Sequence, residues 1–179
     1  MSTTETFRLD RFDPARDSEL LHSWVVADRA RFWMMQDHTV EQVREIYTWL
    51  DEQPTHHVWL VRRGEDPVSL FQDYLPEAEE VGEHYDVRPG DLGVHFMLAE
   101  AATVQRGFTA AVVEHVLAHA FADPAVRRLV AEPDARNTKA VALVRRLGFE
   151  LGPVVELAAK PAQLAFITRE KYAAAIPGP

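Results

Sequence analysis

Apolar residues occur along this chain in several short runs, each of strand length. The first of them, Phe7–Phe12, alternates apolar and polar residues, as expected for a strand with one buried face. The residues Gly64, Glu65 and Asp66 separate two of the runs, so these two are predicted to form a hairpin. The predicted strands are Phe7–Phe12, His57–Arg63, Pro67–Gln72, Asp91–Leu98, Val126–Ala131, Phe149–Leu157 and Ala162–Thr168.

Other segments place apolar residues three or four positions apart, which is the spacing of a helix with one buried stripe. They are Ser18–Ala27, the segment from Thr39 to Pro54, Thr109–Phe121 and Asn137–Leu147. Thr39 and Gln42 stand in capping-box positions, and Gly148 suits a left-handed cap after the last helix. The order β-α-α-β-β-β-α-β-α-β-β predicts a mixed α/β sheet with helices on its faces, not an alternating doubly wound fold.

Composition narrows the class of protein. A chain of 179 residues is expected to form one domain, residues 1–179, and 47% hydrophobic with 26% charged residues is typical of a globular protein. The net charge of -9 argues against nonspecific binding to nucleic acid or anionic membranes. The absence of cysteine excludes disulfides, thiolate catalysis and Cys-ligated metal. With no signal-peptide pattern and no long apolar window, we expect a soluble cytoplasmic protein.

A candidate phosphate-binding loop precedes the third predicted helix. Backbone N–H groups at a helix N-terminus attract phosphate oxygens. Gly107 lets a ligand approach the backbone closely, and Arg106 can add a charge-assisted contact. A glycine before a helix is also an ordinary turn residue, so both interpretations stay open. The segment is not a P-loop, because no Gly-Lys-Ser/Thr follows.

Three polar residues at the ends or inside predicted elements are candidates for chemistry. His95 lies within an apolar strand, Asp134 follows the next strand, and Asn137 begins a helix. Each also has a structural interpretation. His95 can be a structural histidine with its hydrogen bonds satisfied within the core. Asp134 can be a turn residue that bonds the backbone, and Asn137 can be a helix N-cap.

Two segments carry a resemblance to a known family. The segments GDLGVHF (Gly90–Phe96) and AEPDARN (Ala131–Asn137) resemble the Gly-Asp-x-Gly-x-His and x-Pro-Asp-x-Arg-Asn segments of the siderophore-biosynthesis hydroxylamine acyltransferases. These enzymes form a branch of the Gcn5-related N-acetyltransferases, the GNAT superfamily. The C-terminal part, Lys160–Tyr172, is similar to the family's final hairpin, and Arg31–Gln36 is similar to its substrate-side helix region. The element order matches the family along nearly the whole chain.

The resemblance departs from the family in the phosphate loop. The family places Gln or Arg, then Gly, then Gly or Ala at its key positions, where this chain has Val104, Gly107 and Thr109. Only the central glycine matches. This leaves the grip on pyrophosphate in doubt, although backbone donors depend little on the side chains.

The resemblance implies a GNAT fold with a central sheet of about seven strands and about four helices. It also implies that the fourth and fifth strands splay apart to admit the pantetheine of an acyl-CoA such as acetyl-CoA. His95 and Asp134 take the positions of the family's catalytic residues. The residues expected to contact the acyl-CoA are Phe96, Met97, Leu98, Gln105, Arg106, Gly107, Phe108, Thr109, Ala110 and Asn137.

The expected reaction is attack of a hydroxylamine nitrogen on the thioester within a ternary complex. A hydroxylamine is less basic than an alkyl amine, so histidine, with a pKa of about 6.5, is a sufficient base. His95 would take or relay the proton, and Asp134 would orient His95 or the N–OH group. Backbone N–H groups of Phe96–Leu98 would polarise the thioester carbonyl. Without cysteine or a serine nucleophile motif, no acyl-enzyme is expected.

A second group of residues is expected to lie at the site of the amine acceptor. Trp33 and Gln36 are expected to wall the acceptor site, while the four tryptophans are expected to lie mostly in the core. The acidic run Glu77–Asp86 is either a solvated loop or an attractor of a cationic amine. The acceptor is expected to be an N-hydroxylated diamine or amino acid, and the chain a monomer or a homodimer.

No metal site is expected. Adjacent His56 and His57 face opposite sides of a strand, and His115 and His119 lack a third ligand and an HExxH pattern. Three other functions stay open: acylation of an ordinary amine, non-catalytic binding of acyl-CoA, and an interaction domain that no longer binds CoA.

Overall fold

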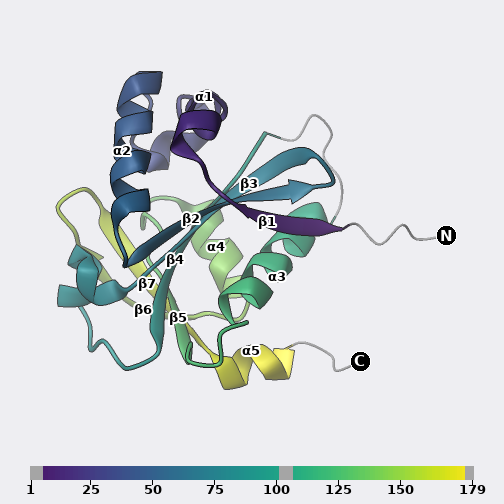
Figure 1. Cartoon of the computed structure of the whole chain (residues 1–179). Coiled ribbons are helices and arrows are strands. Elements are labelled where there is room, and N and C mark those ends of the chain that lie inside the picture. The colour runs from purple at the N-terminus through teal and green to yellow at the C-terminus, as the bar shows by residue number, and fades with distance from the viewer. Residues whose placement is uncertain (1–5, 101–106, 176–179) are drawn as a thin grey trace. The chain divides into compact units, whose positions relative to one another are not determined.

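A computed structural model of the chain describes residues 6–100 and 107–175 (Figure 1). The strands are β1 (Phe7–Arg11), β2 (His56–Arg63), β3 (Asp66–Tyr74), β4 (Asp91–Leu98), β5 (Arg128–Ala131), β6 (Glu150–Glu156) and β7 (Pro161–Thr168). The α-helices are α1 (Pro14–Val25), α2 (Val40–Glu52), α3 (Phe108–Ala120), α4 (Thr138–Arg146) and α5 (Arg169–Ala175). Short 3-10 helices are η1 (Asp28–Trp33), η2 (Pro76–Ala78) and η3 (Glu80–Glu83).

The seven strands form one mixed sheet in the order β1-β2-β3-β4-β5-β7-β6. Strands β4 and β5 are parallel, whereas β1 pairs antiparallel with β2, and β7 antiparallel with both β5 and β6. This confirms the predicted mixed α/β architecture and strand count. The ladder between β4 and β5 ends at the pair Gly93 and Val130, while β4 continues to Leu98.

The chain divides into two compact units. The first contains residues up to 72 together with 96–116, and the second contains 73–95 together with the residues from 117 onward. Within the described residues, no helix has the length and apolar character needed to cross a bilayer.

The first unit has its own core, in which α1 and α2 lie beside each other (Figure 1). One cluster of its buried residues consists of Phe12, Leu21, Val25, Ala30, Val43, Tyr47, Val58, Leu70 and Met97. Helix α1 begins at Pro14, before the predicted Ser18, because the Asp13 carboxylate accepts hydrogen bonds from the Ala15 and Arg16 amides. Trp49 is 54% exposed, so the expectation that the tryptophans lie mostly in the core is wrong for this residue.

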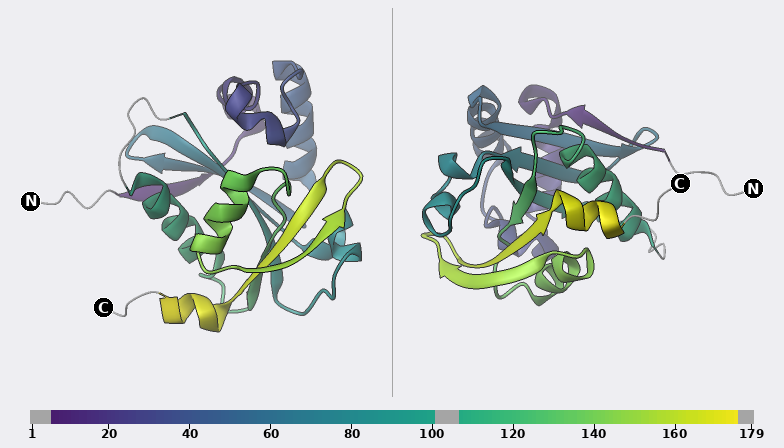
Figure 2. Two further views of the ribbon diagram at one scale, coloured as in Figure 1. Left: turned by 180° about the vertical axis from the view of Figure 1, so that it is seen from behind. Right: turned by 90° about the horizontal axis from the view of Figure 1, so that it is seen from below.

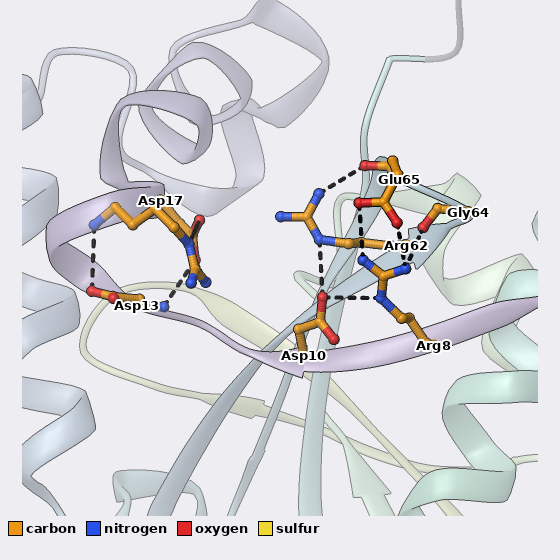
Figure 3. A network of polar contacts seen from close by, with 8 residues as sticks. Arg8, Asp10, Asp13, Asp17, Arg62, Gly64 and Glu65 are labelled. Atoms are coloured by element: carbon orange, nitrogen blue, oxygen red, sulfur yellow. Dashed lines mark hydrogen bonds and ion pairs between the residues drawn. The ribbon is translucent and has the colours of Figure 1, made fainter.

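Polar side chains hold β1 to the turn of the β2–β3 hairpin (Figure 3). Arg8 donates to the Glu65 carboxylate at 2.9 Å and to the Gly64 carbonyl at 2.8 Å. Arg62 donates to the Asp10 carboxylate at 3.0 Å. Arg8, Asp10 and Glu65 are exposed to solvent, so ion pairs between them contribute little to stability.

The second unit has a separate hydrophobic cluster. Tyr74, Val81 and Leu164 form its buried cluster, with Tyr85, Val155 and Phe166 packed against it. Helix α4 lies beside β7 of the β6–β7 hairpin, as Figure 2 shows. Helix α5 continues directly from β7 and was not predicted, because its seven residues carry no buried stripe.

Candidate active site

The glycines before His95 have separate structural reasons. Gly90 adopts a positive φ of 87° at the turn into β4, a conformation that favours glycine. Gly93 gives room to an aromatic ring: a Cβ added there would lie 2.2 to 2.6 Å from ring atoms of Tyr74. Part of the Gly-Asp-x-Gly-x-His pattern is therefore a packing requirement.

Asp91 anchors the start of β4 to the start of β5. Arg128 donates to its two carboxylate oxygens at 2.7 and 2.6 Å, and the Tyr85 hydroxyl donates at 3.1 Å. Burial acts to raise the pKa of Asp91, but Arg128, the Arg88 amide and Tyr85 together outweigh it and lower the pKa. The ion pair lies at the first step of the parallel ladder, so it helps to fix the register of the two strands.

His95 and Glu132 meet just beyond the last paired residues of that ladder. Each lies two positions after a member of the pair Gly93 and Val130. His95 Nε2 and Glu132 Oε1 are hydrogen-bonded. The His95 side chain is 33% exposed and that of Glu132 only 7%, so a buried carboxylate backs a histidine that is open to solvent.

Two further side chains surround Glu132. The Tyr74 hydroxyl donates to Oε1 at 3.2 Å, and the Tyr74 ring lies 5.0 Å from the His95 ring. Lys160 Nζ lies 2.6 Å from Oε2. Oε2 accepts no hydrogen bond of normal geometry among the described residues, so its interaction with Lys160 is that of an ion pair.

These contacts determine the charges of the cluster. Burial acts to raise the pKa of Glu132, but His95 and Lys160 outweigh it and lower the pKa to about 2. Burial, followed by the negative charge of Glu132, raises the pKa of Tyr74 well above its ordinary value. Near neutral pH, Glu132 is therefore an anion and Tyr74 a neutral donor.

Sequence reasoning missed Glu132, Lys160 and Tyr74. One signal for Glu132 was present, since this acid directly follows the buried run Leu129–Ala131. Tyr74 and Lys160 gave no such signal, because they reach the site from the end of β3 and from the turn of the β6–β7 hairpin.

Asp134 lies two residues after Glu132 in the same connection. It is 3% exposed, and its carboxylate accepts from Arg136 Nε at 2.9 Å and from Arg136 Nη2 at 2.7 Å. The hydrogen bond from Arg136 lowers the pKa of Asp134 against the opposing effect of burial. The carboxylate hydrogen-bonded to His95 is that of Glu132, and both roles expected for Asp134 stay predictions.

Asn137 caps α4. Its side-chain oxygen accepts from the Ala140 amide at 3.2 Å, which confirms the N-cap interpretation. A contact with an acyl-CoA stays a prediction. Arg145 and Arg146 are exposed on the last turn of the helix, as expected for a solvated face.

Most residues of the predicted acyl-CoA segment lie in the first unit. Gly107 has a φ of 85°, and a Cβ added there would have no neighbour within 4 Å. Phe108, Thr109 and Ala110 form the first turn of α3. Gln105 and Arg106 lie outside the described residues.

Phe96, Met97 and Leu98 complete β4 in the same unit. The Met97 carbonyl accepts from the Ser69 hydroxyl at 2.8 Å, and the Leu98 carbonyl accepts from Arg29 at 2.8 Å. The end of the strand is therefore held in place by side chains from β3 and η1.

Trp33 and Gln36, predicted for the acceptor side, also belong to the first unit. Trp33 packs partly buried against its core, and Gln36 is exposed and donates to Asp28 at 3.3 Å. Among the described residues, no three metal-ligating side chains gather into a metal site. His56 is buried and His57 exposed, as their alternation along β2 predicts.

Comparison with known proteins agrees with this architecture. Residues 13–157 match the model of the acetyltransferase (GNAT) domain family. The lysine N-acyltransferase MbtK of Mycobacterium sp. (strain MCS) is 28% identical over 148 residues, which cover 76% of this chain and 56% of that protein. The chain thus aligns with little more than half the length of this relative.

Two further matches cover a larger share of the matched protein. The N-hydroxyputrescine acetyltransferase of Acinetobacter baumannii is 24% identical over 149 residues, covering 78% of this chain and 71% of that protein. The structure of AAC(6')-Ib in complex with ribostamycin and coenzyme A superimposes with a TM-score of 0.84 at 21% identity, covering 97% of this chain and 99% of that one. The family match spans most of the chain and agrees with the strand order, so the chain belongs to the GNAT acetyltransferase family.

Proposed function

We propose that this protein is an acyl-CoA-dependent N-acyltransferase whose acceptor is an N-hydroxylated amine, such as an N-hydroxydiamine or N6-hydroxylysine, in hydroxamate siderophore biosynthesis. The observation that carries the proposal is the solvent-accessible His95, backed by the buried carboxylate of Glu132 at the point where the β4–β5 ladder ends. The names of the relatives, a lysine N-acyltransferase and an N-hydroxyputrescine acetyltransferase, support this choice of acceptor.

In the proposed reaction, the hydroxylamine nitrogen attacks the thioester carbon of an acetyl- or succinyl-type CoA. The new C–N bond forms and the C–S bond breaks. The proton leaves the nitrogen for His95, which returns it to the departing thiolate. Such acid–base help is typically worth roughly 10²–10⁴-fold. Asp134 is proposed to orient the N–OH group, because Glu132 already holds His95.

The acyl-CoA is proposed to bind along the end of β4 and the start of α3. Backbone N–H groups of Phe96–Leu98 would polarise the thioester carbonyl. The phosphates would meet the first turn of α3 and the preceding Gln105, Arg106 and Gly107, with Asn137 as a further contact. Trp33 and Gln36 are proposed to wall the acceptor. The mechanism requires no metal.

The acceptor is tested with pairs of compounds that differ by one hydroxyl group. Release of CoA would be measured from acetyl-CoA and succinyl-CoA, with N-hydroxycadaverine against cadaverine and N6-hydroxylysine against lysine. We expect turnover with at least one hydroxylated acceptor and much less with its plain amine. Failure of all hydroxylated pairs, with good turnover of a plain amine, would overturn the acceptor assignment. Binding of CoA in calorimetry without any turnover would instead indicate a non-catalytic binder.

The role of His95 is tested with a matched histidine variant. His95→Gln should lower kcat/KM by roughly 10²–10⁴-fold. His57→Gln, at an exposed position of β2, should leave it unchanged. Asp134→Asn should raise KM for the acceptor more than KM for the acyl-CoA. Near-full activity of both the His95 and the Asp134 variants would refute the assigned roles.

A further inference from the structure

We propose that Glu132 is a positioning residue that fixes the tautomer and orientation of His95, and that Lys160 and Tyr74 hold Glu132 in place for this task. The proposal deepens the proposed function, on which its kinetic part rests. All four side chains belong to one compact unit of the chain.

The hydrogen bond between His95 and Glu132 selects one tautomer. An ionised carboxylate can only accept hydrogen bonds. His95 Nε2 must therefore carry the hydrogen that it shares with Glu132 Oε1. A neutral imidazole has one N–H and one lone pair, so the lone pair is at Nδ1. The acceptor's proton is thus transferred to Nδ1, and Nε2 stays on Glu132 throughout the reaction.

Tyr74 restricts Glu132 and His95 together. Its hydroxyl donates to the same Oε1 at 3.2 Å, and its ring is in contact with the His95 ring at a centroid distance of 5.0 Å. Tyr74 is itself 2% exposed and packed over Gly93. This arrangement leaves Oε1 little freedom to swing away from His95.

Lys160 restricts the other oxygen. It comes from a tight turn in which Leu157 and Lys160 exchange backbone hydrogen bonds of 3.0 and 3.2 Å. Its side chain is 16% exposed and its Nζ lies 2.6 Å from Oε2. A positive charge here keeps Glu132 ionised and also opposes a second positive charge on His95. Glu132 and Lys160 therefore place charges of opposite sign close to the His95 ring.

The other ionisable groups near this cluster do not reverse the effects of the Glu132 and Lys160 charges. Tyr74 is neutral, because burial raises its pKa well above the ordinary value. Asp134 is balanced by its own ion pair with Arg136. The negative charge of Glu79, in the segment that follows β3, also raises the pKa of Tyr74 and so keeps it neutral.

The first test reads the tautomer directly and needs no substrate. Two-bond ¹⁵N–¹H correlation spectra distinguish the Nε2–H from the Nδ1–H form, and His95→Gln identifies the signal among the eight histidines. We expect the Nε2–H form in the wild-type protein and a shift toward Nδ1–H in Glu132→Leu, which has no acceptor oxygen. Glu150→Leu, at an exposed position of β6, is the matched control. An unchanged tautomer in folded Glu132→Leu would overturn the proposal.

The second test uses the sign of the two charges. Removing the carboxylate in Glu132→Gln should move the acid limb of the kcat/KM profile to lower pH. Removing the cation in Lys160→Met should move it to higher pH, and Lys160→Arg should restore it. A purely structural role would not produce opposite shifts. If the acid limb moves in the same direction in Glu132→Gln and Lys160→Met, or moves in neither variant, the assignment is refuted.

The two tests separate the possible failures. If no hydroxylamine is turned over, the proposed function fails, but the tautomer in the substrate-free protein still decides the role of Glu132. If Glu132→Gln does not fold, Lys160→Met and the double variant Glu132→Gln/Lys160→Met replace it. The double variant removes the ion pair without leaving a buried charge unpaired.

Discussion

The site requires glycine at position 93, because a side chain there would overlap the ring of Tyr74. The ring of Tyr74 occupies the space beside Gly93 and extends its hydroxyl to Glu132. A residue of β4 thereby controls the position of a residue of β3, which in turn holds the partner of His95.

Gly93→Ala is expected to destabilise the protein by about 1–3 kcal/mol, because the added methyl group overlaps the Tyr74 ring in a packed interior. The free energy of unfolding would be measured in urea. The matched control places the same change in a Tyr74→Leu background, where the ring is absent. There the additional loss should be smaller, since residues in contact are not additive. Equal losses in both backgrounds would show that the ring is not the cause.

At this scale the sequence predicted only part of the site. His95 stood out as a histidine within an apolar strand, and Asn137 stood out as a helix cap, which the structure confirms. Glu132 did not stand out, because an acid after a strand looks like the start of a loop. Its burial depends on Tyr74 and Lys160, which are distant along the chain, and no local pattern encodes such contacts.

Single elements followed the sequence more closely, and α2 is the clearest case. Thr39 accepts from the Gln42 amide at 3.2 Å, and the Gln42 side chain accepts from the Thr39 amide at 2.8 Å. This is the predicted capping box. Residue types that satisfy orphan N–H groups act locally, and for this reason they are visible in the sequence.

Thr39→Ala is expected to lower the free energy of unfolding by about 1 kcal/mol, because it removes the acceptor for the Gln42 amide. Thr48→Ala makes the same chemical change at an exposed position inside α2 and should alter stability by less than about 0.5 kcal/mol. Chemical denaturation followed by circular dichroism measures both. A Thr39→Ala variant as stable as Thr48→Ala would show that the cap contributes nothing.

The elements that the sequence missed have weaker local signals. The 3-10 helix η1 and the short α5 lack a sustained buried stripe. The strands were found to within a few residues, because their apolar runs are bounded by turn residues such as Gly64. The ending of the β4–β5 ladder at Gly93 and Val130 was expected only from the family resemblance, since a ladder is not a property of one strand.

At the scale of the whole molecule, buried carboxylates link stability to pH. The pKa of Glu132 is about 2 in the folded protein, against an ordinary value of 4.5. The unfolded chain therefore binds this proton more readily. The resulting stabilisation is complete above pH 4.5 and is lost as the pH falls toward 2. The pKa values of Asp17, Asp91 and Asp134 are also lowered, so they act in the same direction.

We expect the wild-type protein to lose stability steeply between pH 5 and pH 3, and Glu132→Gln to lose less over the same interval. The difference between the two curves should be on the order of 2 kcal/mol over this interval, because the titration is complete only below pH 2. Urea unfolding at a series of pH values measures it. Because the change in stability with pH is compared, any loss that Glu132→Gln shows at neutral pH does not affect the result. Parallel curves would contradict the assigned charge of Glu132.

The turn that joins the last two paired strands carries Lys160 into contact with Glu132. A longer turn would carry Lys160 away from Glu132 and remove the cation that helps to keep this buried carboxylate ionised. Engineers who reshape the hairpin should therefore retain a cation at its tip, so that the carboxylate beneath it does not lose its partner.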